Sequence, residues 1–125
     1  MGIMFDVDNV PREGAAIFLD AIGPAQGLWE RSRYERTITN LAYTIMHEIG
    51  HALNLVHTFE INRPDSLSVM NYPQNYIGSR ARGSEAFWKR FNWRFDSFEL
   101  VHLWHATPAE ILPTGQQFGW ANYHR

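Results

Sequence analysis

HEIGHALNLVH, residues 47 to 57, places three histidines and one glutamate within eleven residues. His47 and His51 are four residues apart, so on an α-helix their imidazoles project from one face, one turn apart. His57 can join them if the chain turns sharply after the helix. Three imidazoles suit Zn²⁺, at about 2.0–2.1 Å, and leave the fourth tetrahedral position for water, as a catalytic site requires. Glu48 lies beside this face and can hold that water.

A helical wheel divides residues 40 to 53 into two sectors. We expect the helix to bury the apolar sector and to present the polar one, with Glu48 at its border. The alternative for HExxH alone is a pair of hydrogen-bonded histidines that hold no metal, on an ordinary amphipathic helix. The third histidine argues against this alternative. The polar sector consists of Asn40, Thr44, His47 and His51. The apolar sector consists of Leu41, Ala42, Ile45, Met46, Ile49, Ala52 and Leu53.

A second motif, SVMNYP at residues 68–73, follows the histidines. The two motifs together resemble those of the metzincins, a zinc-peptidase clan that includes astacins, serralysins, matrixins and pappalysins. The clan pattern is HExxHxxGxxH, followed by a tight turn that carries a methionine beneath the metal. The resemblance is strong over about residues 38–76. It implies that Met70 is an apolar support under the histidines and that Tyr72 stands where astacins and serralysins place a tyrosine near the zinc.

The chain departs from the clan pattern at Asn54, which occupies the position of the glycine. That glycine allows a left-handed turn, and asparagine is the other residue that best tolerates this geometry. We therefore expect Asn54 to adopt a positive φ and to end the active-site helix. Thr37 or Thr39 is the expected N-cap of the same helix.

The resemblance implies an α+β fold in a single catalytic domain over residues 1–125. The upper subdomain, 1–57, is expected to pack a small mixed β-sheet on the active-site helix. Two strands are predicted there, Gly2–Asp6 and Ala15–Ala21, the second being the edge strand that an extended substrate would join. The lower subdomain, 58–125, is expected to be irregular, with the methionine turn and a C-terminal helix.

The C-terminal helix is predicted from Asp96-Ser97-Phe98-Glu99, a capping box that starts a helix ending near His105. Its apolar side is expected to consist of Leu100, Leu103 and Trp104. His102 and His105 are spaced for a metal, but they lie outside the motif and are expected to be exposed.

Composition excludes several classes of function. The net charge of −2 gives no reason to expect nucleic acid or a membrane, and the absence of cysteine excludes disulfides and thiolate metal sites. No transmembrane stretch or secretory signal is present; the resemblance slightly favours an extracellular protein, and the oligomeric state stays open. The aromatic segment 84–95 is interpreted as core rather than as a nucleic-acid stacking surface. Asp6, Asp8 and Asp20 are interpreted as solvated turn acids, with calcium as the alternative.

The sequence therefore predicts a zinc-dependent endopeptidase that acts on peptide or protein substrates. Glu48 is the expected general base, and the Tyr72 hydroxyl is the expected donor to the oxyanion. One alternative is a gluzincin, in which Glu85 or Glu99 would replace His57, since Glu60 lies too near His51 to serve. The other is a non-catalytic module that keeps the metal for binding or scaffolding.

Overall fold

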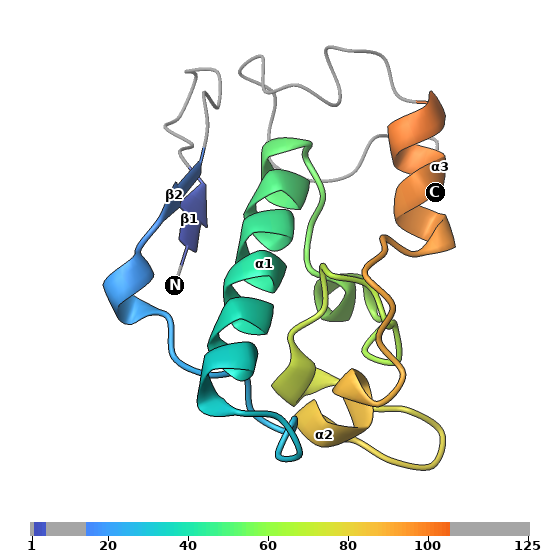
Figure 1. The fold of residues 1–125 in the computed structure, drawn as a ribbon. Helices are drawn as coiled ribbons and strands as arrows, with labels where there is room; N and C mark the ends of the chain where they lie inside the picture. Colours follow the sequence, from blue (N-terminus) through green and yellow to red (C-terminus); the bar gives the residue numbers. More distant parts are fainter. Residues whose placement is uncertain (1, 5–14, 106–125) are drawn as a thin grey trace.

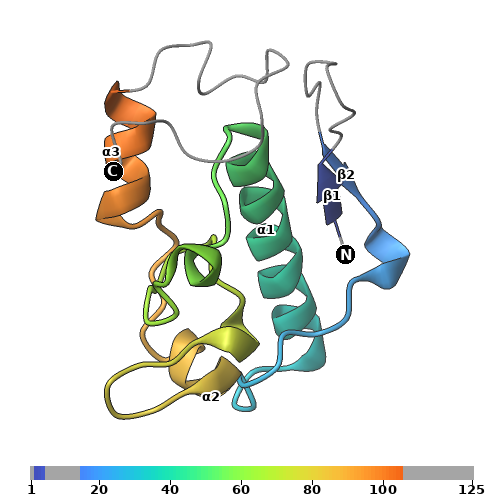
Figure 2. The same ribbon diagram turned by 180° about the vertical axis from the view of Figure 1, so that it is seen from behind.

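In the computed structural model of this protein, the described residues are 2–4 and 15–105. They form a mostly helical small domain organised around one long helix, α1, Arg33–Ala52. A pair of short strands lies on one side of α1, and the described chain that follows α1 lies on the other (Figures 1 and 2). Among these residues, no helix combines the length and apolar character needed to cross a membrane.

The two strands are β1, Gly2–Met4, and β2, Ala15–Ile17, which pair antiparallel with Gly2 opposite Ile17. They are the only strands in the described part of the chain, so the mixed sheet predicted for this region is not observed there. β2 ends earlier than predicted because Leu19–Ala21 forms a 3-10 turn, η1. The Ala21 N–H donates to the Phe18 carbonyl at 3.1 Å, which removes a donor that a longer strand would need.

The N-terminus of α1 is fixed by a capping box five to seven residues earlier than predicted. The Ser32 hydroxyl accepts from the Glu35 N–H at 3.2 Å, and the Glu35 carboxylate accepts from the Ser32 N–H at 2.9 Å. The prediction of Thr37 or Thr39 as N-cap is therefore wrong. Thr37 lies inside the helix, where its hydroxyl donates to the Arg33 carbonyl at 2.9 Å.

The buried side of α1 is not the one that the helical wheel predicted. Ile45 and Ile49 are 41% and 48% exposed, whereas His47 and His51 are buried. The reason is that the second half of the chain packs over the histidine face. Gly50 lies on that face, and a Cβ there would come within 2.2 Å of the Met70 sulfur.

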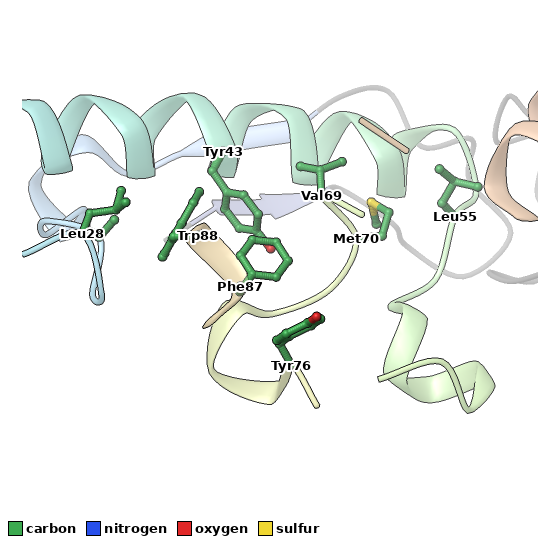
Figure 3. Close-up of a cluster of buried hydrophobic side chains, with 9 residues drawn as sticks. Leu28, Tyr43, Leu55, Val69, Met70, Tyr76, Phe87 and Trp88 are labelled. Atoms are coloured by element: carbon green, nitrogen blue, oxygen red, sulfur yellow. The ribbon is translucent and has the colours of Figure 1, made fainter. Parts of the chain in front are cut away.

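The hydrophobic core lies between α1 and the segments that follow it, and the loop before α1 adds Ala25 and Leu28 (Figure 3). Tyr43 of α1 makes edge-to-face contacts with Phe87 and Trp88, at centroid distances of 6.3 and 5.5 Å. Both of these aromatic residues belong to the short helix α2, Gly83–Trp88. Their burial confirms that this part of the aromatic segment serves as core, whereas Trp93 is 45% exposed. The core consists of Ala25, Leu28, Tyr43, Leu55, Val69, Met70, Tyr76, Phe87 and Trp88.

The predicted capping box starts α3, Ser97–His105, and is confirmed. The Asp96 side chain accepts from the Glu99 N–H at 3.1 Å, and the Glu99 carboxyl accepts from the Asp96 N–H at 2.7 Å. The predicted buried face of α3 is confirmed at Leu103, which packs against the core, and is wrong at Trp104. Trp104 is 72% exposed, while His102 is fully buried with its Nε2 atom 3.3 Å from the Leu53 carbonyl oxygen. This carbonyl, at the end of α1, gives α3 a polar surface on which to pack.

Candidate metal centre

The structure brings the imidazoles of His47, His51 and His57 together. Their Nε2 atoms form a triangle with sides of 3.0 Å (His47 to His51), 3.1 Å (His51 to His57) and 3.2 Å (His47 to His57). Two of the histidines lie on the last turns of α1, and the third follows a reversal of the chain. The described residues contain no other cluster of three His, Cys, Asp or Glu side chains with ligand atoms this close.

The reversal that brings His57 back is built around Asn54, whose φ is 68°. The Asn54 N–H donates to the His51 carbonyl at 2.9 Å, and the Leu55 N–H donates to the Gly50 carbonyl at 3.0 Å. These two bonds are those of a Schellman motif with Asn54 in the left-handed position. The predicted positive φ is confirmed, and the substitution of asparagine for the clan's glycine is therefore compatible with the turn.

The Nδ1 atom of each histidine meets an oxygen. The Nδ1 atoms of His47 and His51 lie 2.8 Å from the carbonyl oxygens of Val69 and Leu55, respectively. That of His57 lies 3.0 Å from a carboxylate oxygen of Glu60. Because these oxygens only accept hydrogen bonds, each Nδ1 must carry the proton and each neutral ring keeps its Nε2 as an acceptor. Three nitrogen lone pairs therefore meet at one point.

The local environment opposes protonation of His47 and His57. Burial, followed by the neighbouring His51, lowers the pKa of His47 to about 3. Burial also lowers the pKa of His57, although Glu60 acts in the opposite direction. Neutral imidazoles are the form that binds metal ions.

The spacing of the nitrogens fits a tetrahedral metal ion. With metal–nitrogen bonds of about 2.05 Å, two ligands at the tetrahedral angle lie about 3.3 Å apart. The observed 3.0–3.2 Å is close to this value. Each Nδ1–H contact also fixes the orientation of its ring, as is typical of histidine ligands in metalloproteins. Three imidazoles at this spacing can thus hold one tetrahedral metal ion and leave its fourth position for another ligand.

Glu48 and Tyr72 flank the histidines. The Tyr72 ring stacks on that of His47 at a centroid distance of 5.3 Å and lies 4.5 Å from that of His57. Burial raises the pKa of Tyr72, and the charges of Glu48 and Glu60 raise it further. Glu48 is 7% exposed, and burial raises the pKa of its carboxyl.

Met70 is fully buried beneath α1, in contact with the position of Gly50. Its turn is held by Ser68, whose hydroxyl accepts from the Met70 N–H at 3.0 Å and donates to the buried Glu99 carboxyl. The residue between them, Val69, provides the carbonyl that orients His47. The methionine turn thus supports the histidines through packing and through one hydrogen bond.

Two supporting residues were not identified from the sequence. Glu60 was considered only as a metal ligand, yet it orients His57, and its position three residues after that histidine was an available signal. Glu99 was placed in a capping box and named as an alternative metal ligand, and no local pattern pairs it with Ser68, which is 31 residues away. Asp20 belongs to no metal-ligand cluster among the described residues, and Asp6 and Asp8 lie outside them.

No protein family, curated protein or solved structure matches this chain. The candidate metal centre therefore stands on the three histidines and on the groups that orient them.

Proposed function

We propose that this protein is a zinc-dependent endopeptidase in which His47, His51 and His57 bind the zinc. One observation carries the proposal: three Nε2 acceptors converge while each Nδ1 is held by an oxygen. Imidazole ligands without thiolates suit zinc, and three protein ligands leave a position for water or substrate. The resemblance to metzincins, which rests on the same residues, supports the peptide bond as the target.

When bound in such a site, zinc supplies Lewis acidity toward a carbonyl and lowers the pKa of a coordinated water. Glu48 accepts the proton of the attacking water and passes it to the leaving amine. Its raised pKa supports this role, because a base works best when its pKa approaches the working pH. The Tyr72 hydroxyl, on a ring that packs on two of the ligands, donates to the developing oxyanion.

The experiment pairs metal content with peptide cleavage. Purified wild-type protein and Glu48→Gln are analysed for zinc and incubated with an unstructured protein substrate. We expect one zinc per chain in both, and turnover about 10²–10⁴ lower in Glu48→Gln because the base is lost while the shape is kept. A chelator should abolish wild-type cleavage, and added zinc should restore it. Wild type that contains full zinc and cleaves nothing would defeat the endopeptidase proposal.

A second function is metal-dependent binding without hydrolysis, in which the three histidines hold a metal ion and Glu48 has no chemical role. This function predicts that neither the wild type nor Glu48→Gln cleaves the substrate. It also predicts that zinc removal weakens partner binding, whereas Glu48→Gln leaves that binding unchanged.

A further inference from the structure

A basic pocket of about 520 Å³ lies away from the histidines, between the loop of residues 77–82 and α2. In Figure 1 this loop is the yellow segment that leads into α2. Three cationic side chains, Arg80, Lys89 and Arg90, line the pocket, and no carboxylate does. The protein as a whole carries a net charge of −2, so this positive charge is a local feature.

Two of the three cations have no acidic partner among the described residues. Lys89 pairs with Glu85 on the same helix, with 2.7 Å between nitrogen and oxygen. Arg80 and Arg90 form no ion pair within residues 15–105. The pocket therefore presents two guanidinium groups whose charge the described part of the protein does not neutralise.

Arg90 is held in place by the buried residue beneath the loop. Its Nη1 donates to the Tyr76 hydroxyl at 3.0 Å, and Tyr76 is only 2% exposed. The loop closes over this hydroxyl at Gly78, where a Cβ would come within 2.4 Å of the tyrosine oxygen. Gly78 also donates its N–H to the Ala81 carbonyl at 2.9 Å, which places Arg80 at the tip of the turn. The rest of the Arg90 guanidinium is left for a ligand.

We propose that this pocket binds an acidic side chain of a peptide, with Arg80 and Arg90 as the carboxylate-binding residues. A guanidinium group offers a planar pair of N–H donors that matches a carboxylate. Nucleic acid fits less well, because stacking requires exposed aromatic faces and the one aromatic residue of the pocket, Tyr76, is buried. None of the residues used here is a candidate metal ligand, so this inference does not depend on the proposed peptidase activity.

The test measures peptide binding directly. A labelled peptide containing two adjacent aspartates is titrated into zinc-loaded Glu48→Gln protein, in which cleavage is suppressed, and its asparagine analogue serves as the control peptide. We expect the acidic peptide to bind about tenfold more tightly, and Arg80→Ala to remove most of this difference, as for one charge-assisted contact. Arg33→Ala, which removes an exposed arginine from the start of α1, is the matched control and should change nothing.

Three results would overturn the proposal: equal affinity for the two peptides, an equal loss in Arg80→Ala and Arg33→Ala, or tighter binding of a single-stranded oligonucleotide than of the acidic peptide. Arg90→Lys keeps the charge but loses the planar fork, so it should reduce the preference for the acidic peptide several-fold. Thermal unfolding of each variant establishes that the fold is retained. Arg80 lies on an exposed loop, so its variant remains informative even if changes at Arg90 disturb Tyr76.

Discussion

Glu60 accepts two hydrogen bonds from His57, one from the backbone N–H and one from Nδ1–H, both at 3.0 Å. The carboxylate therefore fixes both the backbone and the ring of the one candidate ligand that does not lie on α1. Without this contact, the imidazole ring of His57 could rotate about its side-chain bonds. Orientation of the ring matters because the lone pair must point at the metal.

Replacement of Glu60 should weaken zinc binding without removing a ligand. Contacts of this kind are worth about 10- to 100-fold in metal affinity. We expect Glu60→Ala to fall in this range and Glu60→Gln, which keeps an acceptor oxygen, to lose less. Competition with a chromophoric chelator measures the Kd, and Glu30→Gln is the exposed control. Equal affinity in Glu60→Ala and wild type would show that His57 is oriented by something else.

His57→Ala should reduce zinc content far below one per chain, because two imidazoles on one helix complete only half of a tetrahedron. The helix itself should persist, since His57 follows it. Elemental analysis after gel filtration measures the zinc, and circular dichroism checks the helix. Undiminished zinc in this variant would exclude His57 as a ligand. His105→Ala, which removes an exposed histidine of α3, is the control.

Asn54 offers a test of the turn that returns His57 to α1. Asn54→Gly and Asn54→Ala both lose the amide side chain, so the difference between them isolates the backbone conformation. With φ at 68°, alanine should be less stable than glycine by about 1–2 kcal/mol, and valine less stable still. Urea unfolding measures these differences. Equal stability of the alanine and glycine variants would contradict the left-handed turn.

Tyr72→Phe should separate an oxyanion donor from a packing residue. The ring keeps its contacts with the histidines, while the hydroxyl is lost. We expect kcat to fall by about 10²–10³ and KM to stay nearly unchanged, because the donor acts only in the transition state. Steady-state kinetics on a peptide substrate measures both constants. If kcat and zinc content both match those of wild type, the hydroxyl has no part in the reaction.

Glu99 should make the protein less stable as the pH rises toward 8. Burial, followed by the charge of Asp96, raises the pKa of Glu99 to about 8, while Ser68 and Arg63 act against this shift. Between the ordinary value of 4.5 and about 8, the folded protein keeps a proton that the unfolded chain releases. The free energy of unfolding therefore falls across this window, by up to about 1.4 kcal/mol per pH unit for one proton.

Glu99→Gln removes this proton, so its stability should change less between pH 5 and pH 8 than that of wild type. Urea unfolding at four pH values within the window gives both profiles. The comparison is between slopes, because the lost contacts with Ser68 and Asp96 also change the absolute stability. Parallel profiles for the two proteins would show that Glu99 is ionised in the fold.

Several features built from residues close together in the sequence were predictable because their geometry follows from the backbone alone, although the Ser32–Glu35 capping box was missed. The period of the α-helix places His47 and His51 on one face, and the tolerance of asparagine for positive φ places the reversal at Asn54. The capping box at Asp96 and Glu99 is likewise local. Each of these features depends on groups at most four residues apart, so no knowledge of the fold was needed.

The tertiary structure decided which face of α1 is buried and what orients His47. The acceptor for His47 is the Val69 carbonyl, 22 residues away, and the Ser68 hydroxyl reaches Glu99 across 31 residues. The helical wheel could not decide whether the Ile45 face or the histidine face is buried, because other parts of the chain can cover either one. Long-range packing made that choice: the methionine turn and α2 cover the histidine face, and Ile45 and Ile49 stay partly exposed.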